Sequence, residues 1–224
     1  LALFKGDNQL KDLPILLGIM AALFVVSRYN YLLFHSLVEA AMAAMSFTAF
    51  ALAWNSRNFS HGYLLLLGLS YGFIAGLGVL HTLAFKGMGV FPSYGPDLAT
   101  QLWIASRYLT ALILLFAPFY LKRTLPLVPA VLVLSLTTAS TVTAIFLGYF
   151  PVCFVDGVGL TPFKIVSEYI ISGLLIVALG LFLRCRQNFD SATLKLMVLY
   201  FVFSIACGLV FTSYFSVFDY SNLV

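Results

Sequence analysis

Histidine and acidic residues are rare in this sequence, and three of them stand inside strongly apolar stretches. His35 and Glu39 lie four residues apart in one stretch, and His81 lies in the next. Residues four apart on a helix share one face, so His35 and Glu39 can act on the same ligand. Two imidazoles and a carboxylate suit zinc, copper or iron. His35, Glu39 and His81 are therefore a candidate metal site.

A second group of polar residues occurs in two later apolar stretches. It comprises Gln101, Trp103, Arg107, Glu168 and Tyr169. A charged residue at the centre of a membrane-spanning helix costs about 2.5–3.5 kcal/mol on insertion scales, so each one requires a structural or functional reason. Together with the two histidines and the first glutamate, these residues form a candidate ligand-binding site or polar network.

Four interpretations of this set are open. In the first, Arg107 neutralises Glu39 or Glu168 and the histidines complete a structural network that fixes helix register. In the second, the candidate metal site binds an ion. In the third, the two histidines are axial ligands of a haem. In the fourth, an organic ligand lies between the helices, with Arg107 as its anion partner and with Trp103 and Tyr169 as apolar walls. None of these residues is assigned a catalytic role.

The apolar stretches that carry these residues make up most of the chain. Of its 224 residues, 62% are hydrophobic and only 9% are charged, whereas roughly a quarter of the residues of a soluble domain are charged. A membrane span needs about 20 apolar residues, so the chain has room for seven spans and for no additional soluble domain. We therefore expect an all-α integral membrane bundle of about seven transmembrane helices, in a single domain over residues 1–224.

Apolar runs that are bounded by polar or turn-forming residues give the positions of these helices. The expected spans are residues 13–26, 31–54, 62–84, 99–121, 126–146, 164–183 and 192–215. Three connections are short and basic. Two others, residues 85–98 and 147–163, are longer, rich in Gly, Pro and aromatic residues, and lie on the same side of the membrane.

The basic residues give the orientation, because cytoplasmic loops keep an excess of Lys and Arg. With a cytoplasmic N-terminus, the inner residues are Lys5, Lys11, Arg57, Lys122, Arg123, Arg184, Arg186 and Lys195, and the outer ones are Arg28, Lys86 and Lys164. The N-terminus is therefore predicted to be cytoplasmic. All the candidate site residues then lie in the outer half of the membrane. Val224 would lie outside, so we expect an eighth span and a cytoplasmic output module beyond it.

Other sequence features disfavour particular classes of binding site and describe the helix packing. The net charge is +4, but the basic residues form no continuous stripe, so we expect no nucleic-acid binding. Cys153, Cys185 and Cys207 have no CxxC spacing, which disfavours a disulfide framework or a thiolate zinc site. The glycines of the 62–84 span recur every four residues from position 68 to 76 and allow close helix packing, within the chain or in a dimer.

Four sequence blocks resemble a known family. They are residues 34–39 (FHSLVE), 53–56 (AWNS), 80–91 (LHTLAFKGMGVF) and 99–108 (ATQLWIASRY). In this order they are similar to the signature blocks of the third bacterial membrane-associated sensor (MASE-type) family. The resemblance implies a multi-pass input domain in the bacterial inner membrane, followed by one more helix and by a histidine kinase or diguanylate cyclase. It also implies a homodimer, because such kinases and cyclases generally act as dimers.

We therefore expect a sensory domain without enzymatic activity of its own, which detects a ligand or metal at the outer polar cluster and signals to the cytoplasmic output. The alternative is an integral-membrane enzyme or redox protein that binds a metal or haem. A transporter is disfavoured, because the inner half of the membrane has no matching polar path and His61 stands alone there.

Overall fold

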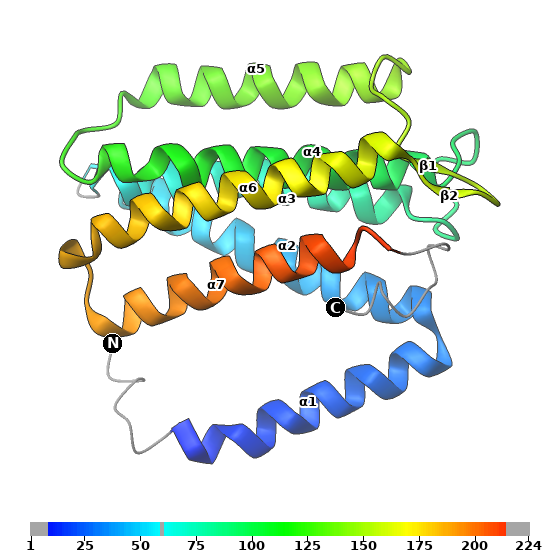
Figure 1. The fold of residues 1–224 in the computed structure, drawn as a ribbon, viewed down its shortest axis with the longest axis horizontal. Coiled ribbons are helices and arrows are strands. Elements are labelled where there is room, and N and C mark those ends of the chain that lie inside the picture. The colour runs from blue at the N-terminus through cyan, green and yellow to red at the C-terminus, as the bar shows by residue number, and fades with distance from the viewer. Residues whose placement is uncertain (1–8, 59–60, 214–224) are drawn as a thin grey trace.

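The computed structural model describes residues 9–58 and 61–213, and these form seven α-helices and a small hairpin (Figure 1). The helices are α1 (Gln9–Tyr29), α2 (Tyr31–Asn55), α3 (Gly62–Ala84), α4 (Asp97–Phe116), α5 (Leu127–Phe146), α6 (Pro162–Arg184) and α7 (Ser191–Val210). Two 3₁₀ turns, η2 (Ala117–Tyr120) and η3 (Arg186–Asn188), follow α4 and α6. The strands β1 (Phe154–Val155) and β2 (Gly159–Leu160) pair antiparallel.

Six of the helices, α2 to α7, are long and apolar enough to cross a membrane, counting η2 with α4. This confirms the all-α membrane bundle. Within the described residues, α1 supplies only a shorter apolar segment, Leu17–Tyr29, so a crossing by the first helix stays a prediction. Residue 5 and the last two residues of the expected 192–215 span lie outside the described residues.

Local capping explains where several helices begin. The Asn30 side chain accepts a hydrogen bond from the Leu33 N–H at 3.0 Å, which separates α2 from α1. Thr161 caps α6 in the same way and is followed by Pro162, whose missing N–H is not needed at a first helical position. Asp190 caps α7 through the N–H groups of Ala192 and Thr193. Each boundary therefore follows from a side chain that satisfies otherwise unpaired backbone donors.

Helices α3 and α4 form the centre of the bundle. Helix α2 packs on α3, α6 packs on α4, α7 packs on α6, and α5 contacts both central helices. Helix α1 contacts α2 and lies at the edge of the bundle (Figure 1). The largest hydrophobic cluster joins buried residues of α3 and α4 with Phe154 of the hairpin. The two central helices thereby hold the hairpin in place.

Small residues of α3 pack closely against α2 near the connection between the two helices. A Cβ at Gly68 would lie 2.1 Å from the Ala53 Cβ, and a Cβ at Gly72 would lie 2.7 Å from the Phe50 ring. One turn further along, Gly76 has no neighbouring atom within 4 Å of such a Cβ. The tightest packing of α2 on α3 among these glycines therefore lies near their connection, at the end away from His35 and His81.

The structure adds two features to the elements expected from sequence. The loop between α5 and α6, expected as a long connection rich in Gly, Pro and aromatic residues, contains the β1–β2 hairpin, whose turn includes Gly157 at φ +79°. Residues 99–121, expected as one helix, end as the 3₁₀ turn η2, with Pro118 near its start. Proline has no N–H to donate to the preceding turn, which explains the change of helix type.

Candidate functional site

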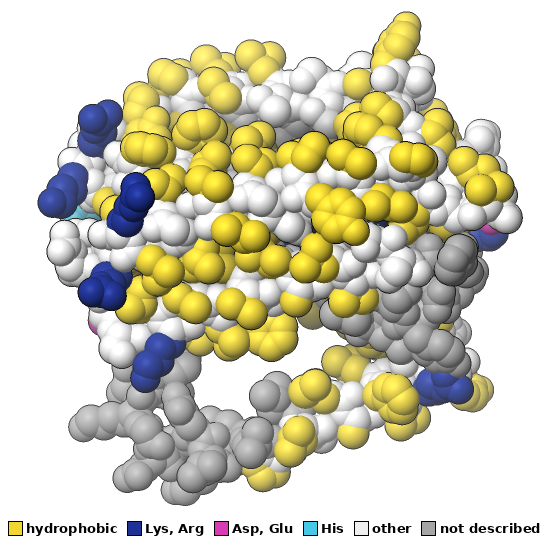
Figure 2. Space-filling model, viewed as in Figure 1, with side chains coloured by type: hydrophobic (Ala, Val, Ile, Leu, Met, Phe, Trp, Pro, Cys, Tyr) yellow, Lys and Arg dark blue, Asp and Glu magenta, His cyan; other side chains and the backbone are white. Residues whose placement is uncertain are grey.

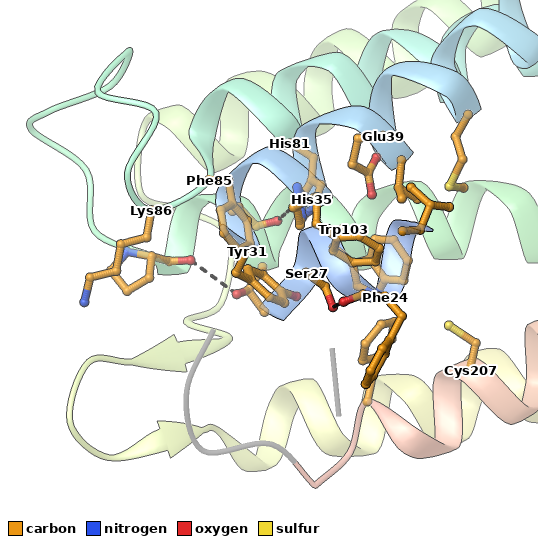
Figure 3. A pocket seen from close by; sticks show the side chains of 18 of the residues that line it. Phe24, Ser27, Tyr31, His35, Glu39, His81, Phe85, Lys86, Trp103 and Cys207 are labelled. Carbon is orange, nitrogen blue, oxygen red and sulfur yellow. Dashed lines mark hydrogen bonds between the residues drawn. The ribbon is translucent and has the colours of Figure 1, made fainter. Parts of the chain in front are cut away.

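A cavity of about 520 Å³ opens between α1, α2, α3, α4 and the end of α7 (Figure 3). Most of its lining is apolar or aromatic, and His35, Glu39 and His81 supply polar groups to its wall. The lining residues are Met20, Leu23, Phe24, Ser27, Tyr31, Phe34, His35, Val38, Glu39, Met42, His81, Phe85, Lys86, Pro96, Ala99, Thr100, Trp103, Cys207 and Phe211. An apolar pocket with a few convergent polar groups is the usual form of a small-molecule site.

The antiparallel packing of α2 and α3 brings the two histidines together. His35 lies in the second turn of α2 and His81 in the last turn of α3, so both lie at the same end of the helix pair. Their ring centroids are 5.4 Å apart. Phe85 stacks on His35 at 3.9 Å between centroids, and Trp103 lies 5.7 Å from the His81 ring. Aromatic rings thus surround both imidazoles and restrict their orientation.

The donor atoms of His35, Glu39 and His81 lie within 4.8 Å of one another. The Nδ1 atom of His81 lies 2.8 Å from the carbonyl oxygen of Ala99. A carbonyl oxygen can only accept, so Nδ1 carries the proton and donates it. The Nδ1 atom of His35 is buried and has no hydrogen-bond partner among the described residues. The arrangement can hold a cation or the polar group of a ligand.

A charged network lies next to this cavity, behind Trp103. Glu168 is fully buried and lies 3.2 Å from the Lys164 Nζ and 3.9 Å from the Arg107 Nε. The Trp103 indole donates to Glu168 at 3.2 Å. Arg107 also donates to the side chain and the carbonyl oxygen of Ser204 on α7, both at 2.7 Å. The network therefore joins α4, α6 and α7.

Two cavity-lining residues, Trp103 and Phe211, connect the cavity to this network. Their rings meet edge to face at 5.2 Å between centroids. Trp103 binds Glu168 as described, and the Phe211 carbonyl oxygen accepts from Lys164. Phe211 directly follows α7. A movement of this part of the cavity wall would consequently reach the end of α7.

Polar contacts with the start of α4 hold the loop between α5 and α6. Asp97 accepts the N–H groups of Cys153 and Phe154 at 2.7 and 2.8 Å, and Gln101 donates to the carbonyl oxygens of Phe150 and Pro151. Burial raises the pKa of the Cys153 thiol to about 12, so this cysteine stays protonated at neutral pH. Gln101, expected in the polar cluster, instead holds the α5–α6 loop through its two hydrogen bonds.

The structure divides the remaining sequence candidates between the cavity and the network. Of the two possible carboxylate partners, Glu168 is the one beside Arg107. Tyr169, expected as an apolar wall, is 55% exposed and does not line the cavity. The reason is helix geometry: successive residues point about 100° apart, so a buried Glu168 turns its neighbour outward. Tyr169 therefore points away from this cavity.

In a comparison with protein-family models, residues 26–224 match MASE3, described as a membrane-associated sensor domain. The chain belongs to this family. No curated protein and no solved structure matches the chain significantly. The matched residues of this MASE3 domain include every polar residue of the cavity wall and of the charged network, so both sites lie within the part that defines the family.

Sequence reasoning missed several residues of this MASE3 domain. Lys164 was interpreted only as an outer charge that sets the topology, yet its side chain is fully buried. Its position four residues before Glu168 was an available signal for an ion pair. Ser204 and the Phe211 carbonyl had no comparable signal, because they reach the network only through the packing of α7 on α6.

Proposed function

We propose that this MASE3 domain is the sensory input of a signalling protein, in which a ligand or metal bound in the cavity controls a cytoplasmic histidine kinase or diguanylate cyclase. The output domain would belong to the same polypeptide, and the protein would act as a homodimer in the bacterial inner membrane. The observation that carries this proposal is the set of His35, Glu39 and His81 donors, within 4.8 Å of one another at the wall of a 520 Å³ cavity.

The burial of polar groups in an apolar bundle supports a binding role. His81 is buried, and His35 and Glu39 are half-buried within a helix that is otherwise apolar. Ionisable groups at membrane depth are costly and commonly mark ligand or ion sites. Family membership supports the sensory role of such a site.

The connection from the cavity to α7 suggests how a signal would leave the site. Trp103 and Phe211 line the cavity, and both are hydrogen-bonded to the charged pair Lys164 and Glu168 on α6. A ligand that binds one arrangement of these groups more tightly shifts the population towards it. The position of α7 relative to α4 and α6 would change with that population.

The second candidate function is an integral-membrane metal enzyme or redox protein. Three protein ligands beside an open cavity are also the arrangement of catalytic metal sites, which keep one position for water or substrate. Turnover of a lipid-soluble substrate by the purified protein would favour this candidate. Regulation of a kinase or cyclase without such turnover would favour the sensor.

A cavity-filling substitution tests the sensory role. Val38 lines the cavity, whereas the adjacent Leu37 is 49% exposed on the outer side of α2. In the complete polypeptide, Val38→Trp should hold the output in one state, so that kinase or cyclase activity changes several-fold and no longer responds to stimulus. Leu37→Trp should leave the activity unchanged. Equal activity and equal response in both variants would overturn the proposed function.

A further inference from the structure

We propose that His35, Glu39 and His81 together bind one divalent transition-metal ion of the zinc, copper or iron class, with a further coordination position open to the cavity. This names the ligand of the sensing cavity and rests on the function proposed above. The three residues come from facing segments of α2 and α3, so an ion bound there would join the two helices at the end away from their connection.

His81 is oriented as a metal ligand. Its Nδ1–H donates to the Ala99 carbonyl oxygen on α4, which leaves Nε2 as the nitrogen with a lone pair in the neutral ring. Histidines that bind metals almost always donate their other ring N–H to a carbonyl or carboxylate in this way, because the bond fixes the tautomer and the ring orientation. The start of α4 thus provides the outer support for a ligand carried by α3.

His35 contributes a nitrogen that the protein does not otherwise satisfy. Its Nδ1 is buried without a hydrogen-bond partner among the described residues, although buried polar atoms are nearly always paired. The ring is held by stacking on Phe85, 3.9 Å between centroids. Coordination by an ion would satisfy this nitrogen without disturbing the stack.

The charge balance also favours a cation. Across the described residues, Glu39 has no ion pair. Lys86, which lines the cavity, lies 3.0 Å from Asp156, and Arg107 of the neighbouring network lies 3.9 Å from Glu168. Two neutral imidazoles add no charge to the carboxylate. A buried carboxylate requires a compensating charge or a proton, and a divalent ion shared with the histidines would provide the charge.

The spacing of the donors links binding to movement. The donor atoms lie within 4.8 Å of one another, whereas ligands about 2.0–2.1 Å from a tetrahedral ion are roughly 3.3 Å apart. Coordination would draw the side chains of α2 towards His81 by up to about 1–1.5 Å, on the same geometric basis. Since Trp103 lies against the His81 ring, this contraction would act on the part of the wall that connects to Glu168.

The donor types select among metals. Nitrogen ligands suit zinc, copper and iron, whereas magnesium and calcium require sites made of oxygen atoms. The thioethers of Met20 and Met42 line the same cavity and offer softer donors nearby. We therefore expect zinc and copper to bind and magnesium not to bind.

Metal titration of the detergent-purified protein tests this site. Zinc, copper and magnesium are added separately to the metal-stripped protein, and bound metal is measured by elemental analysis after desalting. We expect one equivalent of zinc or copper and no magnesium. Each of His35→Ala, Glu39→Gln and His81→Ala should weaken binding about 100-fold or more, at least as much as the loss of an outer-shell partner does. The exposed His61 gives the matched control, His61→Ala, which should bind like the unchanged protein.

A fluorescence measurement distinguishes the loss of metal binding from poor folding of a variant. The chain has two tryptophans, so Trp54→Phe leaves Trp103 as the reporter, 5.7 Å from the His81 ring. Copper bound at the site should quench this fluorescence strongly at stoichiometric concentration. Glu39→Gln, which keeps the shape of the side chain, should retain the unquenched spectrum and thermal unfolding while losing the quenching.

The outcomes of these experiments test the metal site and the sensory function independently of each other. Binding that none of the three substitutions weakens, or the absence of zinc and copper binding, would refute the metal site. If Val38→Trp still alters the output in that case, the sensing cavity stands with a different ligand. Metal binding together with an output insensitive to Val38→Trp would keep the metal site and reject the sensory function.

Discussion

Glu168 is the residue on which the buried charges depend. It is the one carboxylate between two cations, Lys164 and Arg107, and it also accepts from the Trp103 indole. The space beside it is narrow: a Cβ added at Gly208 of α7 would lie 2.8 Å from the Arg107 guanidinium and 3.0 Å from the Glu168 carboxylate. Glycine at position 208 thus allows α7 to approach the charges closely, and the ion pairs bind three helices to one another.

The first prediction concerns this carboxylate. Glu168→Gln leaves two cations without their anion in a buried site, and we expect it to lower the free energy of unfolding by about 3–5 kcal/mol. The control is Asp156→Asn, which makes the same acid-to-amide change in a pair whose side chains are 63% and 44% exposed. An exposed pair contributes about 0–1 kcal/mol. Thermal and denaturant unfolding in detergent measure both variants, and equal stabilities would contradict the role given to Glu168.

At the scale of elements, the packing of α2 on α3 positions the site. The helices touch closely at Gly68 and Gly72, where small residues let the backbones approach, whereas a Cβ at Gly76 would meet no atom within 4 Å. Apolar side chains gain little by leaving lipid for one another, so close backbone approach is a main source of helix association in membranes. The close contact near the connection therefore fixes α2 on α3, and both helices contribute cavity-lining residues at their other end.

The second prediction tests this contact. Gly68→Ala would place a methyl group 2.1 Å from the Ala53 Cβ, so α2 and α3 must move apart, and overpacking of this kind costs about 1–3 kcal/mol. Gly76→Ala meets no atom within 4 Å and adds helix propensity of up to about 1 kcal/mol. We expect a lower melting temperature for Gly68→Ala and an unchanged or higher one for Gly76→Ala. The reverse order would show that the glycine face does not hold the two helices together.

Over the whole molecule, the Lys and Arg side chains are distributed unevenly between the two ends of the bundle. Figure 2 shows Lys and Arg side chains gathered at the end of the bundle where the η2–α5 and α6–α7 connections lie. The surface between the two ends is largely hydrophobic, as the many exposed Leu, Val, Ile and Phe side chains of the helices indicate. Such a band matches the hydrocarbon core of a bilayer. The excess of positive charge at one end favours a cytoplasmic location for that end.

The third prediction is this orientation. Pro92, in the α3–α4 loop, and Asn58, after α2, lie at opposite ends of the bundle and are both exposed. In a background without native cysteines, Pro92→Cys should react with a membrane-impermeant maleimide in intact cells, and Asn58→Cys should react only after permeabilisation. The opposite labelling pattern would invert the topology and place the cavity in the inner half of the membrane.

Sequence alone determined six segments that can span a membrane and the end of the α2–α3 pair at which His35, Glu39 and His81 lie. The 62–84 helix coincides with α3, and His35, Glu39 and His81 were expected to meet, because hydropathy records which residues enter the membrane and chain order records at which end they lie. Rotation of each helix about its axis was decided only by the tertiary structure. The rotation of α6 points Tyr169 outward and buries Lys164 beside Glu168. The rotation of α4 directs the Gln101 side chain to the α5–α6 loop. Lipid is as apolar as the protein interior, so these helices lack the polar face that marks the exposed side of a soluble helix, and helix packing alone selects the inward face.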